Sequence, residues 1–315
     1  MKRILVTGAA GAIGRNLLKG LYALHGHEAV VAGYNKTPLT GLPEDGLSIK
    51  VDVTNKENLR SVIEQYDAGD VYHLSALLSI AAEKDPELAR RVNMGGLKNV
   101  LDLAKKYDLK VFWPSSIAVF GSTAPKYNTP QDVPLDPEFE YGRNKVEGEK
   151  LLQQFFDEFG VDARSVRYPG LLAHGKPGPG TTEYAIEMMY AAVIGKPFAS
   201  PLGPDTVLPM MDMRDAIRAA LEIMAAPNES IKVRTSYNLS AMSFTPEQLA
   251  TEIRKHIPGF ELQYEIDDLK QRVADSWPDT IDDSVAREQW GWRHRYGLSE
   301  TVEYMIREIR KEIVV

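Results

Sequence analysis

The stretch TGAAGAIG, residues 7–14, directly follows the apolar run ILV at residues 4–6 and opens a segment of helical periodicity. In a turn between a strand and a helix, Gly8 permits a sharp bend, Gly11 lets backbone amides approach an anion, and Gly14 lets the helix pack closely on the strand. The positive end of the helix favours a phosphate at this point. The stretch therefore predicts a site for a dinucleotide pyrophosphate, with a merely tight strand-to-helix turn as the alternative.

Short β-branched runs alternate with helical segments through the first half of the chain. The expected strands are residues 4–6, 28–33, 47–53, 70–74, 110–116 and 161–170. The expected helices are residues 13–24, 56–66, 87–107 and 141–159. Repeated strand and helix predicts an α/β fold, a doubly wound parallel sheet of the Rossmann type covered on both faces.

The pattern changes after Pro169. We expect a helix at residues 181–195 capped by Thr181 or Thr182, a second helix at 212–226, a strand at 235–240, and a third helix that begins at Thr245 and Pro246. The division that follows is a dinucleotide-binding domain at residues 1–168. A smaller substrate-binding lobe occupies residues 169–315, with some of its segments returning to the main sheet.

Bulk composition restricts the classes of function. The 315 residues are 43% hydrophobic and 26% charged, with a formal net charge of −7. An acidic chain without a basic patch is repelled by phosphate backbones, so we expect no nucleic acid and no membrane as partner. The opening apolar run ends too soon for a signal peptide, and no run reaches the length of a membrane span. There is no cysteine and the six histidines are scattered, so we expect a cytoplasmic protein without a metal site.

A tyrosine and a lysine stand four residues apart in YGRNK, residues 141–145. On a helix these positions share a face, so the Lys145 ammonium can lie near the Tyr141 phenol and, with an oxidised nicotinamide, favour its deprotonated form. Ser116 ends the fifth expected strand, where its hydroxyl can donate to a reacting oxygen. We interpret Ser116, Tyr141 and Lys145 as a catalytic set with Tyr141 as the base. The alternative is a surface tyrosine and lysine that only pack on the helix.

Together these motifs resemble the extended group of the short-chain dehydrogenase/reductase superfamily. The G-x-x-G-x-x-G spacing is followed by VDVT at 51–54, HLSA at 73–76 and WPSSIAVFG at 113–121, and YGRNK matches the group's Tyr-x-x-x-Lys. The resemblance implies that the residues contacting a nicotinamide dinucleotide are Gly8, Gly11, Ala12, Ile13, Gly14, Tyr34, Asn35, Asp52, Val53, Leu74, Ser75, Ala76, Asn93, Tyr141, Lys145 and Tyr168.

The second half narrows the resemblance. Relatives that bind nucleotide sugars commonly carry an arginine in a motif similar to RDYIHVxD, whereas Leu208 and Pro209 take the place of that Arg-Asp pair here. The chain is similar instead to the short-chain type of L-threonine 3-dehydrogenases, through RYPG at 167–170, PGPGTTEYA at 177–185, YNLSAMSFTP at 237–246 and DSWPDTIDDS at 275–284. This resemblance implies oxidation of L-threonine to 2-amino-3-oxobutanoate, with hydride transfer to the nicotinamide.

A zwitterionic amino acid needs hydrogen-bonding groups near its carboxylate and its ammonium. The resemblance implies a substrate pocket formed by Ser79, Ser116, Tyr141, Thr181, Thr182 and Trp277. Simpler roles are open for several of them: Ser79 caps a turn, the two threonines cap their helix, and Trp277 belongs to the core.

An acid about 20 residues past the glycines usually bonds the adenosine ribose and indicates NAD. Tyr34 stands at that place, followed by Asn35 and Lys36, so the carboxylate that would repel a 2′-phosphate is missing. Since the subfamily uses NAD, we expect NAD, with NADP as the alternative.

Two other functions are compatible with parts of the pattern. One is a nucleotide-sugar epimerase or dehydratase with the same fold and catalytic set. The other is a nonenzymatic dinucleotide sensor, against which the intact Tyr141 and Lys145 argue. The group commonly pairs through its long helices, so the resemblance also implies a homodimer formed by residues 87–107 and 141–159.

Overall fold

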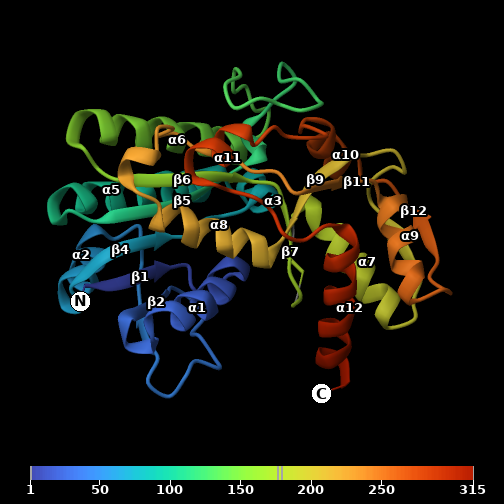
Figure 1. The fold of residues 1–315 in the computed structure, drawn as a ribbon, viewed down its shortest axis with the longest axis horizontal. Coiled ribbons are helices and arrows are strands. Elements are labelled where there is room, and N and C mark those ends of the chain that lie inside the picture. The colour runs from blue at the N-terminus through green and yellow to red at the C-terminus, as the bar shows by residue number, and fades with distance from the viewer. Residues whose placement is uncertain (1, 176, 179, 315) are drawn as a thin grey trace.

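The computed structural model describes residues 2–175, 177–178 and 180–314. Within these ranges, parallel strands form a seven-stranded sheet in the order β10-β6-β5-β4-β1-β2-β3. The strands are β1 (Arg3–Thr7), β2 (Val30–Tyr34), β3 (Leu47–Lys50), β4 (Ala68–His73), β5 (Lys110–Ser116), β6 (Ala163–Tyr168) and β10 (Tyr237–Asn238). The sheet and its helices confirm the predicted doubly wound α/β fold (Figure 1).

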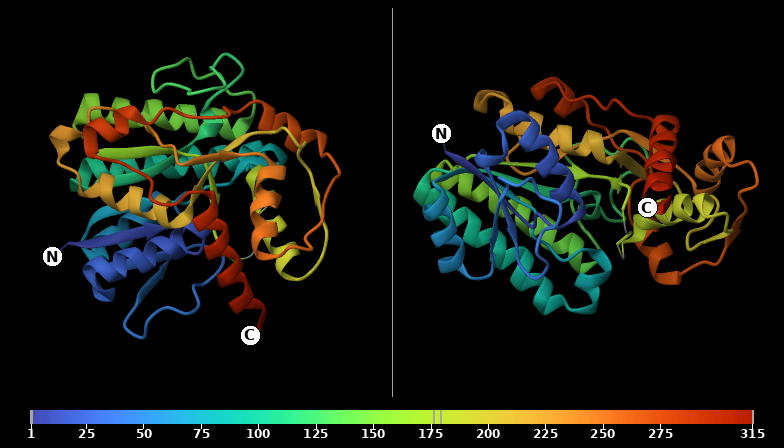
Figure 2. Two further views of the ribbon diagram at one scale, coloured as in Figure 1. Left: turned by 45° about the vertical axis from the view of Figure 1, so that its right-hand side comes forward. Right: turned by 90° about the horizontal axis from the view of Figure 1, so that it is seen from below.

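Helices cover both faces of the sheet, and the alternation of side chains along each strand shows why. In β2, Val30 and Ala32 pack with α1 (Ala12–His25) and α8 (Met213–Ala225). Val31 points to the opposite face, into the core with α2 (Lys56–Tyr66), α5 (Gly96–Tyr107) and α6 (Glu140–Phe159). The two views of Figure 2 show these layers. A strand buried on both faces needs a continuous apolar sequence, which is the pattern of Ile4 to Val6 in β1 and Val30 to Ala32 in β2.

The helix expected at residues 87–107 is continuous but not uniform. It consists of α4 (Pro86–Ala89), a π-helical turn η2 (Arg90–Gly95) and α5. The side chain of Asp85 caps its start by accepting from the Leu88 amide, at 3.0 Å. The π-helical turn carries Asn93, which the structure buries. Such single wide turns are often found beside functional sites.

The second half builds smaller units beside the main sheet, as Figure 1 shows on its right-hand side. A three-stranded sheet has the order β11-β9-β7, and β12 pairs with β8. These strands are β7 (Gly170–Leu172), β8 (Phe198–Ser200), β9 (Leu208–Asp212), β11 (Met242–Phe244) and β12 (Leu262–Tyr264). The further helices of this half are α7 (Tyr184–Val193), α9 (Pro246–His256), α10 (Asp268–Asp275), α11 (Ser284–Trp290) and α12 (Leu298–Val314). The short helix α3 (Ser79–Lys84) belongs to the first half, where it follows β4.

Two expectations for this half have different outcomes. Thr245 and Pro246 begin α9 as predicted, with a capping box between Thr245 and Gln248. The predicted cap by Thr181 or Thr182 is wrong. These residues lie inside a short 3₁₀ turn, η4 (Thr181–Glu183), which precedes α7, and neither helical start has a side-chain cap. The boundary after residue 168 stays a prediction, while β10 from the second half pairs with β6 in the main sheet.

Two kinds of feature are absent from the described residues. No helix among them combines the length and the apolar character that a bilayer crossing requires. They also contain no group of three or more histidine, aspartate or glutamate side chains placed to hold a metal ion.

Candidate active site

A cavity of about 630 Å³ lies at the carboxyl ends of β1, β4, β5 and β6, where the second half of the chain meets the main sheet. Crevices at this end of a parallel sheet are the usual ligand sites of such folds. The predicted site residues in the cavity wall are Ala12, Ile13, Leu74, Ala76, Ser79, Ser116, Tyr141, Lys145, Tyr168, Thr181, Thr182 and Trp277. The structure therefore brings the predicted catalytic and substrate residues, with part of the predicted cofactor residues, to a single cavity.

The glycine turn brings the backbone close to the neighbouring strand. Gly8 has a φ of +70°, and a Cβ at this position would come within 2.8 Å of the backbone of Leu74 and Ser75. At Gly14 a Cβ would lie 2.6 Å from the Ala9 Cα. Gly11, the N-cap of α1, has no side chain to bond the first amides of the helix. The turn therefore presents unbonded amides at the cavity, which suits a phosphate group.

Other predicted cofactor residues lie outside the cavity wall: Gly8, Gly11, Gly14, Tyr34, Asn35, Asp52, Val53, Ser75 and Asn93. Two of these have side chains with protein partners. Asp52 Oδ1 accepts from the amide and the hydroxyl of Thr54, at 3.0 and 2.7 Å. The Asn93 amide bonds both backbone groups of Leu77, at 2.8 and 3.1 Å, and so holds the segment after β4 in place.

The three predicted catalytic residues come from two adjacent elements. Ser116 ends β5, Tyr141 lies in the first turn of α6, and Lys145 follows one turn later. Lys145 Nζ donates to the Pro114 carbonyl at 2.5 Å and lies 4.3 Å from the centroid of the Trp113 ring. The same ammonium is 5.5 Å from the centroid of the Tyr141 ring. The helical spacing thus places the phenol and the ammonium on one side of the cavity.

Burial has the largest effect on the pKa values of Tyr141 and Lys145. It raises the pKa of Tyr141 to about 12, although a hydrogen bond with Ser116 acts in the opposite direction. Burial lowers the pKa of Lys145 to about 7, and the Glu149 carboxylate opposes this shift. Both shifts favour the neutral form of the side chain, as expected for groups withdrawn from water. At neutral pH the phenol of the ligand-free site is therefore protonated, and additional positive charge is needed to make it a base.

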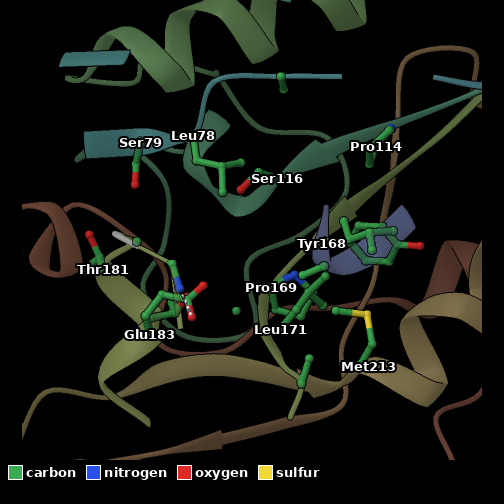
Figure 3. A pocket seen from close by; sticks show the side chains of 18 of the residues that line it. Leu78, Ser79, Pro114, Ser116, Tyr168, Pro169, Leu171, Thr181, Glu183 and Met213 are labelled. Carbon is green, nitrogen blue, oxygen red and sulfur yellow. Dashed lines mark hydrogen bonds between the residues drawn. The ribbon is translucent and has the colours of Figure 1, made fainter. Parts of the chain in front are cut away.

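Tyr168 reaches the cavity with its ring only. Its hydroxyl donates to the Ala216 carbonyl at 2.5 Å, and Figure 3 shows it directed away from Ser116. If Tyr168 contacts a cofactor in this cavity, it would do so through its ring and not through its hydroxyl.

The opposite end of the cavity carries the predicted substrate residues. Ser79 begins α3 and Thr181 begins η4. Figure 3 shows these two side chains and Ser116 around the same space. Thr181 is 1% exposed, and its hydroxyl has no hydrogen-bond partner among the residues that the structure describes. Trp277 both lines the cavity and belongs to the core. A buried polar group without a partner is costly, and the Thr181 hydroxyl is the one of Ser79, Ser116 and Thr181 for which this holds among the described residues.

The sequence interpretation missed Glu183, which also lines this end of the cavity (Figure 3). Its Oε2 accepts from the Gly178 amide at 3.1 Å. Burial raises the pKa of this carboxyl, and the nearby Glu187 raises it further. The sequence could have indicated Glu183 as a site residue, because it directly follows the predicted substrate residues Thr181 and Thr182. A carboxylate here adds an acceptor that can bind an ammonium group.

Comparison with known proteins places this geometry in a family. Residues 4–240 match the model of the NAD dependent epimerase/dehydratase family. An uncharacterized epimerase/dehydratase of Staphylococcus haemolyticus is 46% identical over 314 residues, 99% of each chain. The holo form of a GalE-like L-threonine dehydrogenase from Cupriavidus necator has a TM-score of 0.95 and 45% identity, covering 98% of this chain and 99% of that one. A monomeric L-threonine 3-dehydrogenase from a metagenome, in its apo form, has a TM-score of 0.94 and 44% identity over the same shares. The chain therefore belongs to the NAD dependent epimerase/dehydratase family, the extended group of short-chain dehydrogenase/reductases.

Proposed function

We propose that this protein is an L-threonine 3-dehydrogenase, which oxidises L-threonine to 2-amino-3-oxobutanoate with NAD as the hydride acceptor. The observation that carries the proposal is the single cavity in which Ser116, Tyr141 and Lys145 face the polar residues Thr181 and Glu183. Similar proteins named L-threonine dehydrogenases align over nearly the whole chain.

The residues present fit a nicotinamide dinucleotide. A side chain at Gly8 would meet the backbone of Leu74 and Ser75 after β4, and a side chain at Gly14 would meet the backbone of Ala9 in the turn. The amides at the start of α1 would hold the pyrophosphate, while Lys145 would bond the nicotinamide ribose. When bound, the oxidised nicotinamide supplies a two-electron acceptor for the hydride.

Tyr141 and Ser116 handle the proton of the threonine hydroxyl. Ser116 orients the hydroxyl oxygen, and Tyr141 as phenolate takes its proton while the Cβ–H bond breaks. The electron pair of that bond leaves as hydride, and the Cβ–O bond becomes a carbonyl. Because burial raises the pKa of Tyr141 to about 12, the phenolate requires positive charge nearby, and a protonated Lys145 contributes part of it.

The polar groups at the other end suit an amino acid. The Ser79 and Thr181 hydroxyls would donate to the substrate carboxylate, and the Glu183 carboxylate would accept from its ammonium. The buried residues Leu208 and Pro209 occupy β9, where relatives that bind nucleotide sugars commonly have an arginine. The proposed substrate is therefore a small zwitterion.

The direct test is a substrate panel. Pure protein is incubated with threonine, serine, 3-hydroxybutyrate and a nucleotide sugar, each with NAD and with NADP, and reduced cofactor is followed by absorbance. We expect turnover of threonine with NAD. The Tyr141→Phe variant should lose about 10² to 10⁴ in rate while still binding NADH. A nucleotide sugar converted without net reduced cofactor would instead identify an epimerase or dehydratase.

We also propose a homodimer formed through the helical segments 87–107 and 141–159, as the resemblance implied. The similar protein from a metagenome is named as monomeric, so the assembly can differ between relatives. Sedimentation equilibrium distinguishes the two states, and a single species of 35.1 kDa would reject the dimer.

A further inference from the structure

Three consecutive residues of β5 lie beside three residues of α6 that are spaced four apart. Lys145 Nζ donates to the Pro114 carbonyl at 2.5 Å. Ser115 Oγ donates to Glu149 Oε1 at 2.6 Å. Ser116, the next residue of β5, lies by the Tyr141 phenol and opposes the rise of its pKa. One face of α6 is thereby tied to the end of β5, and Glu149 is the member of this series that does not reach the cavity.

Glu149 is anchored from a second strand. It is 1% exposed, and Arg167 of β6 donates to both of its oxygens, at 3.0 and 2.7 Å. Arg167 in turn donates to the Gln131 carbonyl and to Asn238 Oδ1, each at 3.0 Å. A buried carboxylate with this set of donors is fixed in position.

We propose that Glu149 is a positioning residue, which holds the end of β5 against α6 and places a carboxylate one helical turn from Lys145. This inference rests on the proposed function, because Lys145 matters only where it serves a bound cofactor and Tyr141. A carboxylate one helical turn from the ammonium stabilises its charge, since the two groups share a helix face.

The groups around Lys145 give its positive charge little stabilisation. The Nζ faces the Trp113 ring of β5 and the Tyr141 ring of α6. His73 of β4 lies close enough for the two groups to repel when both are charged. The Arg167 cation of β6 is paired with Glu149 at 2.7 Å. Glu149 is the group that raises the pKa of Lys145, against the lowering by burial.

The test compares Glu149→Gln with Glu147→Gln. Glu147 lies on the same helix, is exposed, and pairs with Arg90 at 2.9 Å. NADH binding is measured by fluorescence from about pH 6 to about pH 9, together with kcat for threonine. Wild type and Glu147→Gln should bind NADH more tightly below about pH 7 than above it. Glu149→Gln should lose that pH dependence, since its lysine is already neutral, and its kcat should fall about tenfold or more.

A merely structural role would lower the melting temperature of Glu149→Gln without changing the pH dependence of NADH binding, and this result would overturn the proposal. Wild type that binds NADH but oxidises no threonine would reject the proposed function alone. If Glu149→Gln does not fold, Ser115→Ala removes the middle bond of the series and leaves the ion pair with Arg167 intact. Its kcat should then fall several-fold, and wild-type kcat in Ser115→Ala would overturn the proposal.

Discussion

At the scale of single residues, removal of the Thr181 hydroxyl should weaken substrate binding without lowering the stability of the fold. A valine has nearly the same shape, so Thr181→Val removes a buried donor that has no partner in the described part of the protein. We expect the melting temperature to stay equal or to rise, and KM for threonine to rise about tenfold or more, because a hydroxyl that bonds the substrate is lost.

Thr301 provides a matched control for this prediction. It is fully buried in α12, and its hydroxyl is likewise without a partner among the described residues, but it does not line the cavity. Thr301→Val should therefore share the effect on melting temperature and leave KM unchanged. An unchanged KM in both variants would show that the Thr181 hydroxyl does not touch the substrate.

Tyr34 decides a second property at the same scale, the choice between NAD and NADP. It ends β2, and its register partner on β3 is Lys50, so no carboxylate stands at this pair of positions. A Tyr34→Asp variant would place a negative charge where a 2′-phosphate would lie. The ratio of kcat/KM for NADP to that for NAD should fall about tenfold or more. An equal ratio in variant and wild type would mean that the ribose lies elsewhere.

At the scale of elements, the sequence identified those whose pattern is repeated over many residues. The predicted positions are close for the strands β1 to β6 and the helices α1, α2, α5 and α6. In these elements the spacing of apolar residues along the sequence follows the side of the element that is buried. The short elements α3, β8, β11 and β12 were not predicted, since a few residues carry no periodicity, and η4 was taken as part of the helix at 181–195. The long helix α12 was not predicted either. The catalytic set came from a motif of fixed spacing. Glu183 and the pair of Glu149 with Arg167 depend on contacts between distant segments, which spacing alone does not reveal.

The end of α8 offers a stability test at this scale. The last carbonyls of a helix have no partner within it. Here Arg164, 1% exposed, donates to the carbonyls of Ile223 and Ala226, each at 2.6 Å, and pairs with Asp162 at 2.8 Å. Arg164→Met should lower the free energy of unfolding by about 3 kcal/mol, because it leaves these acceptors unbonded.

Chemical denaturation measures this loss, with Arg90→Met as the control. Arg90 forms an exposed ion pair with Glu147, so its removal should cost about 0.5 kcal/mol or less. Equal losses in the two variants would contradict the role given to Arg164 at the end of α8.

At the scale of the whole molecule, the two halves share buried polar bonds as well as apolar cores. Asn238 of β10 accepts from Arg167 of β6, and its amide donates to the carbonyls of Thr129 and Asp282, each at 3.2 Å. The edge of the main sheet is thus bonded to segments far away in the sequence. We therefore expect the two halves to unfold together in a single transition, so that a change at the centre of the sheet alters the free energy of unfolding of the whole chain.

His73 makes that stability depend on pH. It is 1% exposed in β4, its Nδ1 lies 2.8 Å from the Thr7 hydroxyl, and burial together with the charge of Lys145 lowers its pKa to about 3. In the unfolded chain a histidine has a pKa of about 6.5. As the pH falls from about 6.5 to about 3, the unfolded chain binds a proton that the folded chain does not, so unfolding becomes more favourable by up to about 1.4 kcal/mol per pH unit.

The His73→Asn variant should lose less stability over this window, whereas the exposed His25→Asn should follow the wild type. Urea denaturation at several pH values measures the three slopes, and identical slopes for His73→Asn and wild type would mean that His73 is protonated in the folded protein.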